Sequence, residues 1–230
     1  RRLLPRNLLT PQDVAAMIER CVNDRDRAFI AVLWETGARI GELIDLRVGD
    51  IEDGPTGKHV VVMGKTGARR LLLVESEPHI TRWLATHPDP RAQMPLWCKI
   101  EQGRPDEQIS YNYIRLRLLE RARKRADVEK PVNPHHFRHS RATHLANWLT
   151  EAQLCGWFGW VQGSKVPARY VHLSGRDIDA AYLALANADG YEELPAPSRQ
   201  SSAEVETHRR SPAPDTRCTQ GNDRRQDQCG

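Results

Sequence analysis

The sequence predicts a mainly α-helical domain with a small antiparallel β-hairpin, which is an α+β fold class. Stretches with a helical spacing of apolar residues, separated by helix-capping residues, cover most of the chain before residue 188. A single pair of β-rich runs interrupts them near residue 65. A chain of 230 residues with 39% hydrophobic content can bury one sizeable core. We therefore expect one helical domain built around that core.

Three helices are predicted near the start of the chain. Thr10 is a typical N-cap and Pro11 a typical first helical residue, so a helix is expected to run from there to about Arg20. A second helix with an apolar stripe follows and ends at Gly37, because glycine adopts the left-handed conformation that stops a helix at little cost. A short third helix is expected over residues 39–46.

The hairpin is predicted from two β-rich runs, His59–Met63 and Arg70–Val74, separated by the segment Gly64–Arg69. Two glycines in a short segment between such runs are typical of a β-hairpin. Lys65 is then expected near its tip.

The rest of the chain before residue 188 is predicted to be helical with short connectors. Pro134 opens one helix, Thr150 caps another, and Ser174–Asp177 resembles a capping box. One helix is very basic, which fits either a face toward a DNA backbone or an ordinary solvated surface. The helices are expected at residues 76–87, 110–126 (the basic one), 135–148, 150–158 and 178–187, and the connectors at 88–95 and 159–167.

We divide the chain into a linker remnant at residues 1–9, one domain at 10–188 and a tail at 189–230. The first eight residues show no clear periodicity and no initiator methionine opens the chain, so we expect a fragment of a longer protein. In the tail Ser, Pro, Gln, Asp, Glu and Arg prevail, and large apolar residues are few. Such a composition cannot repay its ordering entropy, so the tail is expected to be disordered.

Composition excludes some classes of protein and favours others. The formal net charge is +4 and arginine supplies most of the basic residues, which favours a nucleic-acid partner about as strongly as an ordinary basic surface. No apolar run approaches the roughly 18 residues that span a bilayer, and no secretory signal is present, so a soluble, cytoplasmic protein is expected. The five cysteines are scattered without a C-x-x-C pair, which argues against a disulfide framework and a thiolate zinc site.

Four separated segments carry residue types suited to chemistry on a phosphate group. In the first, Thr36–Leu43, Gly37 allows a sharp turn that sends Arg39 inward from the start of a short helix. In the second, the hairpin, the ammonium group of Lys65 could swing toward a leaving oxygen. Taken singly, each is also explained without a function, as a surface arginine and a solubilising lysine.

The third segment is Pro134–Ser140, where His135 and Arg138 lie three residues apart and so share one face of a helix. A histidine and an arginine placed in this way can bind the same phosphate group. The fourth is the pair Gly159–Trp160, followed after a short interval by Tyr170.

In this order the four segments resemble the tyrosine recombinase, or phage integrase, family over about residues 10–188. The family pattern is an arginine in a G-x-R-x-x-E-L context, a hairpin lysine, an H-x-L-R-H box, a G-H or G-W pair and a nucleophilic tyrosine. Phe137 replaces the leucine of the box, and Trp160 stands where a histidine is usual, although its indole N–H can still donate. The amino-acid sequences of Phe158–Ser164 and Tyr170–Asp177 are most similar to those of archaeal and Xer-like integrases.

The resemblance implies the tyrosine recombinase catalytic-domain fold and a set of residue roles. The family cuts a DNA strand by attack of the tyrosine oxygen on a phosphodiester, leaving a 3′-phosphotyrosyl link and a free 5′-hydroxyl, and then rejoins it without metal or ATP. The implied catalytic residues are Arg39, Lys65, His135, Arg138, Trp160 and Tyr170, with Glu42 and His139 orienting them. Expected DNA contacts are Arg69, Arg115, Arg121, Lys124, Arg141 and Lys165.

Each implied role answers a physical need of this reaction. Arg39 and Arg138 would stabilise negative charge on the non-bridging oxygens. Lys65 would protonate the departing 5′ oxygen, and His135 would contact the phosphate and help to move protons. No cofactor is implied. The implied partner is double-stranded DNA with a specific recombination site, bound by a homotetramer at the nucleoid, while the isolated fragment could be monomeric.

Three other interpretations stay open. His135 and His139 lie four apart on one helical face, with His136 and His144 nearby, which fits a metal site, although a third ligand is not evident. The fold could also serve a DNA-binding protein without catalysis, although all six implied catalytic residues are present. A type IB topoisomerase or telomere resolvase would use the same chemistry on another substrate, but the short integrase-like spacing favours recombination.

Overall fold

The structure, a computed structural model of the 230-residue chain, describes residues 7–174 and Tyr182. Residues 1–6 of the expected linker, nearly all of the expected helix at 178–187 and the expected tail at 189–230 lie outside this description. Within the described part, no helix combines the length and the apolar character needed to cross a membrane.

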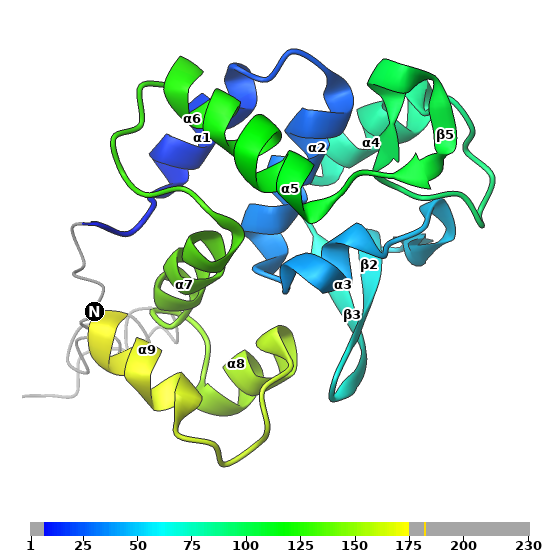
Figure 1. The fold of residues 1–230 in the computed structure, drawn as a ribbon. Coiled ribbons are helices and arrows are strands. Elements are labelled where there is room, and N and C mark those ends of the chain that lie inside the picture. Colours follow the sequence, from blue (N-terminus) through cyan, green and yellow to red (C-terminus); the bar gives the residue numbers. More distant parts are fainter. Residues whose placement is uncertain (1–6, 175–181, 183–230) are drawn as a thin grey trace, which may run out of the picture. The chain divides into compact units, whose positions relative to one another are not determined.

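The described chain is mostly helical and carries two small antiparallel sheets (Figure 1). Its helices are α1 (Pro11–Glu19), α2 (Asp24–Thr36), α3 (Ile40–Ile44), α4 (Glu77–Thr86), α5 (Tyr111–Tyr113), α6 (Glu120–Arg125), α7 (Pro134–Leu145), α8 (Glu151–Phe158) and α9 (Val166–Ser174). A π-helical segment, η4 (Ile114–Leu119), joins α5 to α6, and there are 3-10 turns at η2 (Val48–Asp50) and η3 (Ile100–Gln102). The strands are β1 (Ile51–Gly54), β2 (Gly57–Gly64), β3 (Gly67–Leu73), β4 (Cys98–Lys99) and β5 (Arg104–Gln108).

Local sequence signals set the start of α1 and the end of α2 as predicted. The Thr10 hydroxyl accepts the N–H of Asp13, whose carboxylate accepts the N–H of Thr10, so α1 begins with a capping box. Gly37 ends α2 at φ 54°, in the left-handed region that favours glycine. A Cβ on Gly37 would also lie 2.6 Å from a ring carbon of Phe158. The chain therefore turns sharply just before Arg39.

The predicted hairpin is present and forms part of a three-stranded sheet in the order β1-β2-β3. β2 and β3 pair as far as Gly64↔Gly67, which leaves Lys65 and Thr66 at the tip. β1 and the β4–β5 pair were not predicted. β1 has the sequence Ile-Glu-Asp-Gly, whose Asp and Gly are typical of turns, so its pairing with β2 makes it a strand.

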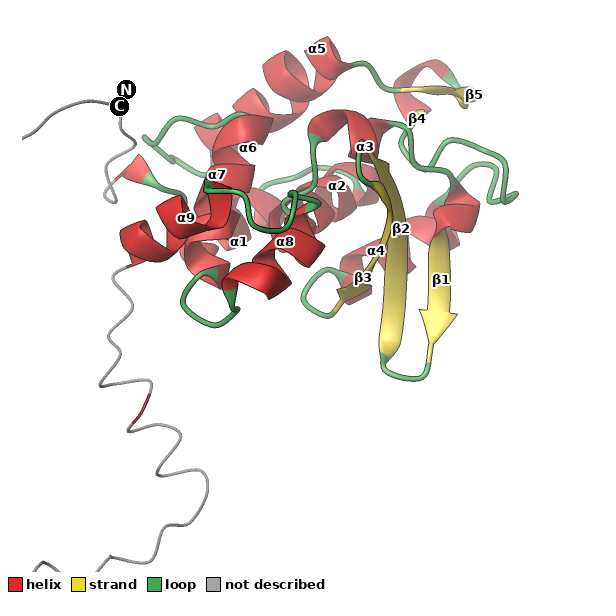
Figure 2. Cartoon of the chain, turned by 90° about the horizontal axis from the view of Figure 1, so that it is seen from below, coloured by secondary structure: helices red, strands yellow, loops and turns green. Residues whose placement is uncertain are grey.

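Helix α2 lies at the centre of the main hydrophobic core. All its residues from Ala28 to Thr36 are buried, and Phe29 packs edge-on against Trp97 at 5.1 Å between ring centroids. A second, smaller cluster joins α7, α8 and α9 and includes Phe158 and Tyr170. Figure 2 shows these three helices next to one another. This smaller cluster fixes Tyr170 against α7 and α8.

A buried carboxylate at the end of α2 fastens this helix to the start of α4. Glu35 accepts hydrogen bonds from the N–H groups of Val74, Glu75 and Ser76 and from the Ser76 hydroxyl. Its carbonyl oxygen accepts another from the guanidinium of Arg141 in α7. Glu35 thus ties three helices together around the core.

We expect Glu35→Ala to lower the free energy of unfolding by about 2–4 kcal/mol, because it removes several hydrogen bonds to one carboxylate and leaves buried donors unpaired. Urea unfolding followed by circular dichroism measures the change. Glu75→Ala is the matched control, since that side chain is exposed and only its backbone N–H takes part. Its effect should stay within about 0.5 kcal/mol. Equal stability of Glu35→Ala and the unaltered chain would contradict this role.

Candidate active site

Four of the predicted site residues reach one region from four separate elements. Arg39 is the N-cap of α3, Arg138 lies in α7, Trp160 follows the C-cap of α8, and Tyr170 lies in α9. The ring of Trp160 stacks on that of Tyr170 at 5.1 Å and lies 5.5 Å from the guanidinium carbon of Arg138. The structure therefore brings together side chains that are far apart in the sequence.

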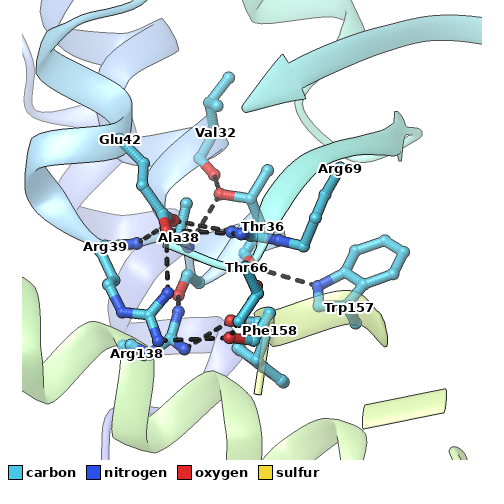
Figure 3. A network of polar contacts seen from close by, with 12 residues as sticks. Val32, Thr36, Ala38, Arg39, Glu42, Thr66, Arg69, Arg138, Trp157 and Phe158 are labelled. Carbon is cyan, nitrogen blue, oxygen red and sulfur yellow. Dashed lines mark hydrogen bonds and ion pairs between the residues drawn. The ribbon is translucent and has the colours of Figure 1, made fainter. Parts of the chain in front are cut away.

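Arg138 is buried and fixed by backbone atoms. It donates hydrogen bonds to the carbonyl oxygens of Gly37, at 2.8 Å, and Phe158, at 2.7 Å, which lie at the ends of α2 and α8 (Figure 3). Burial, and after it the charge of Arg39, lower the pKa of Arg138 to about 10. The guanidinium stays protonated at neutral pH, so it supplies a fixed positive charge in a place shielded from water.

Glu42 lies between two arginines and orients Arg39. Its carboxylate accepts the backbone N–H and the Nη1 of Arg39, both at 2.9 Å, and the Nη2 of Arg69 at 2.7 Å. Burial raises the pKa of Glu42, but the hydrogen bonds from Arg69 and Arg39 outweigh it and lower that pKa on balance, so the group stays ionised. The Arg39 side chain is 37% exposed, which leaves it an open face toward solvent.

The hairpin tip lies beside the turn that follows α8. The Thr66 hydroxyl donates to the carbonyl oxygen of Gly159 at 3.4 Å. A Cβ on Gly159 would lie 2.4 Å from Nη1 of Arg69, so glycine leaves room for that guanidinium. Lys65 is exposed at this tip. The contacts of Thr66 and Arg69 thus hold the lysine hairpin next to the turn that carries Trp160.

Tyr170 is buried, and its hydroxyl is hydrogen-bonded to a histidine. Its ring lies nearly parallel to that of Trp160, with 6° between the planes, and its hydroxyl is 2.7 Å from Nδ1 of His139. Burial raises the pKa of Tyr170, although the charges of Arg138 and Arg169 act in the other direction. The residue is a neutral phenol at neutral pH and must lose its proton to become a nucleophile.

The predicted histidine, His135, is linked to Tyr170 through His139. The Nε2 atoms of the two histidines are 2.6 Å apart, and His135 is exposed. Burial, followed by the charges of His135, His136, Arg138 and Arg169, lowers the pKa of His139 to about 4. His139 is therefore neutral at neutral pH. In the described part of the chain these histidines belong to no group of three or more possible metal ligands.

Four of the residues expected to contact DNA are exposed. Arg115, Arg121 and Lys165 lie open to solvent, as does Lys124, whose ammonium is also 3.6 Å from the carboxylate of Glu120. An exposed ion pair of this kind contributes little to stability. These side chains are therefore free to turn toward a phosphate backbone.

The structure argues against Arg69 and Arg141 as DNA contacts. The Arg69 side chain is only 8% exposed and is paired with Glu42. Arg141 is buried, its Nε donates to the carbonyl oxygen of Glu35, and its guanidinium lies over the ring of Trp34. Both arginines stabilise the fold, so we remove them from the expected DNA surface.

One protein-family model matches most of the chain. The model of the phage integrase family matches residues 7–176. The chain belongs to the phage integrase family. The resemblance drawn from the four sequence segments is thereby confirmed at the level of the family.

This phage integrase-family chain is similar to bacterial tyrosine recombinases. It is 30% identical over 166 residues to tyrosine recombinase XerD of Mycobacterium tuberculosis (strain ATCC 25618 / H37Rv), a match that covers 63% of the chain and 49% of that relative. It is 32% identical over 122 residues to a tyrosine recombinase of Synechococcus elongatus, covering 52% of the chain and 38% of that relative. The chain thus spans about half the length, or less, of these relatives. They agree with the Xer-like part of the expectation, and the archaeal part stays a prediction.

Solved recombinase structures share the fold of this phage integrase-family chain. The crystal structure of XerA recombinase superposes with a TM-score of 0.58 at 20% identity, over 81% of this chain and 66% of that one. XerH bound to a palindromic difH substrate, in a post-cleavage complex, gives a TM-score of 0.59 at 19% identity, over 81% and 54%. The expected tyrosine recombinase catalytic-domain fold is confirmed.

Sequence reasoning missed the helix that carries the tyrosine and the contact that its hydroxyl makes. The connector was expected to run to residue 167, whereas α9 begins at Val166. Pro167 in its first turn was an available signal of a helix start. His139 was expected only to orient other groups, yet it contacts the Tyr170 hydroxyl directly. No sequence signal showed this, because the packing of α7 against α9 decides it.

Proposed function

We propose that residues 10–188 form the catalytic domain of a site-specific DNA recombinase that cuts and rejoins strands through Tyr170. The observation that carries the proposal is the stack of Arg138, Trp160 and Tyr170, which sets a guanidinium, an indole and a phenol from three segments around one point. Family membership and similarity to XerD support the same activity.

In the proposed first step the Tyr170 oxygen attacks a DNA phosphodiester. A bond forms between that oxygen and phosphorus, the bond to the 5′ oxygen of the next nucleotide breaks, and a 3′-phosphotyrosyl link remains. Attack by the 5′-hydroxyl of another strand reverses the step and releases Tyr170. Because the covalent link keeps the energy of the broken ester, rejoining needs no ATP.

Arg39 and Arg138 are the proposed stabilisers of the transition state. Negative charge gathers on two non-bridging oxygens at phosphorus, and donors that are already fixed in a shielded site lower its energy most. Two carbonyl oxygens hold Arg138, and Glu42 holds Arg39, so neither guanidinium has to reorganise during the reaction. The indole N–H of Trp160 is proposed to add a neutral donor.

The proposed substrate is double-stranded DNA with a specific recombination site. XerH has been solved bound to its difH substrate, and lambda integrase as a tetramer bound to a Holliday junction. By analogy we propose that this protein acts as a tetramer on DNA, in the cytoplasm at the nucleoid. The basic side chains proposed to contact the phosphate backbone are the exposed Arg115, Arg121, Lys124 and Lys165.

Incubation with a nicked suicide DNA substrate tests this function. The short strand beyond the nick diffuses away after cleavage, so the cut strand stays attached to the protein. We expect a DNA-linked band on a denaturing gel, in buffer that contains EDTA and no ATP. A shifted band on a native gel without any covalent species would overturn the proposal in favour of a DNA-binding protein without catalysis.

Lys65→Ala is expected to slow cleavage of this substrate by about 100-fold, because the departing 5′ oxygen would lack a proton donor. The variant should approach the unaltered rate when sulfur replaces the bridging 5′ oxygen, since a thiol has a much lower pKa and leaves without protonation. Quenched time courses measure both rates. Lys58→Ala is the matched control, because Lys58 lies on the same hairpin away from the tip and pairs with Asp53. An equal loss on both substrates would refute the general-acid role.

A further inference from the structure

Three side chains form a continuous path from the buried tyrosine to the surface. The hydroxyl of Tyr170 lies 2.7 Å from Nδ1 of His139, and Nε2 of His139 lies 2.6 Å from Nε2 of His135. Tyr170 is 5% exposed, His139 is half-buried and His135 is exposed. Each group is thus within hydrogen-bond distance of the next, from the interior to solvent.

These contacts allow two arrangements of the protons. A neutral imidazole carries a proton on only one ring nitrogen. When Tyr170 donates to Nδ1 of His139, the His139 proton is on Nε2 and is donated to the bare Nε2 of His135. The His135 proton is then on Nδ1. In the opposite arrangement, Nε2 of His135 donates to Nε2 of His139, and Nδ1 of His139 donates to the Tyr170 oxygen. The distances between the three side chains are the same in both arrangements.

We propose that His139 and His135 form a proton relay, in which His139 takes the Tyr170 proton during cleavage and returns it during rejoining. This inference rests on the function proposed above. The Tyr170 proton moves to Nδ1 of His139 as the phenol oxygen bonds to phosphorus. The Nε2 proton of His139 passes to Nε2 of His135, and the Nδ1 proton of His135 goes to water. The path ends in the opposite arrangement, from which rejoining runs it backwards.

The charges around His139 favour a relay over a single proton transfer. Burial, together with His135, His136 and Arg138 on α7 and Arg169 on α9, lowers the pKa of His139 to about 4. An imidazolium held at this position would therefore cost free energy. In the relay His139 gains one proton as it loses another and stays neutral, while the excess proton leaves through the exposed His135 to water.

Nitrogen-15 spectra of the imidazole groups test the arrangement in the free chain, without DNA. We expect His139 to be neutral at pH 7 and its Nδ1 signal to shift in Tyr170→Phe, because that change removes the phenol hydrogen bond. His144, near the other end of α7, should keep its signals. A doubly protonated His139 at pH 7, or an Nδ1 signal unaffected by Tyr170→Phe, would overturn the relay.

Single-turnover cleavage of the nicked substrate tests the proton transfer itself. His139→Asn keeps a side-chain oxygen that can accept from Tyr170, but it cannot pass a proton on to His135. We expect it to cleave about 100-fold more slowly. Sulfur at the 5′ bridging position should not restore the rate, since it helps only the leaving group. His144→Asn, on the same helix, is the matched control and should cleave at the unaltered rate.

The outcomes separate this inference from the function on which it rests. Covalent DNA with the unaltered chain, combined with an unaltered rate for His139→Asn, would refute the relay and leave the recombinase function standing. Absence of covalent DNA with the unaltered chain would refute the function itself. Thermal unfolding shows whether His139→Asn is folded, and if it is not, the spectra of the unaltered chain and Tyr170→Phe decide.

Discussion

Tyr170→Phe is expected to abolish the DNA-linked species, with a fall in the cleavage rate of at least ~10⁴-fold. The change removes the oxygen that would attack phosphorus and keeps the ring that stacks on Trp160. The fold should therefore be preserved, and the loss would be a loss of chemistry. A denaturing gel of the nicked substrate, together with thermal unfolding of the variant, measures both quantities.

Tyr182→Phe is the matched control for the nucleophile. Tyr182 is 69% exposed, and its loss should leave the cleavage rate unchanged. Tyr113 has a structural role, because its hydroxyl accepts a hydrogen bond from Arg25 and donates one to Glu101. Continued trapping of DNA by Tyr170→Phe would mean that another residue is the nucleophile.

Arg138→Lys is expected to slow cleavage by at least about 1,000-fold. Lysine keeps the positive charge but not the planar fork, which donates to Gly37 and Phe158 and still has N–H groups to offer a phosphate. The loss should persist at saturating DNA, because it concerns the transition state rather than binding. Single-turnover rates at several protein concentrations separate the two effects.

Arg141→Lys separates this loss from a general weakening of the fold. Arg141 lies about one turn further along α7, is also buried, and donates to the carbonyl oxygen of Glu35. We expect the substitution to lower the free energy of unfolding but to leave the cleavage rate of the folded protein unchanged. An unaltered rate for Arg138→Lys would exclude the proposed role of its guanidinium.

The fold was predictable where a local signal decides the structure. The Thr10 hydroxyl caps a helix within its own turn, and Gly37 ends the next one because it has no side chain. Gly64 and Gly67, on either side of Lys65, predict the hairpin because glycine is typical of tight turns between strands. The candidate site was predicted for another reason, since its four segments resemble the pattern of the phage integrase family, whose model matches residues 7–176.

Contacts between distant segments could not be predicted. β1 and the β4–β5 pair are short, and their partners rather than their own residues make them strands. Arg69 has the positive charge expected of a DNA contact, but its side chain is buried in an ion pair with Glu42 of α3. His135 and His139 lie on one helix at spacings that do not tell which of them meets Tyr170. The packing of α7 against α9 makes that choice.

Tyr170 is the residue that we expect to become covalently joined to DNA. Nuclease and trypsin digestion of the DNA-linked protein, followed by mass spectrometry, identifies the attached residue directly. We predict a nucleotide on the tyrosine of the peptide Tyr170–Arg176, which trypsin releases by cutting after Arg169 and Arg176. A nucleotide on any other residue, with the Tyr170 peptide unmodified, would contradict the account.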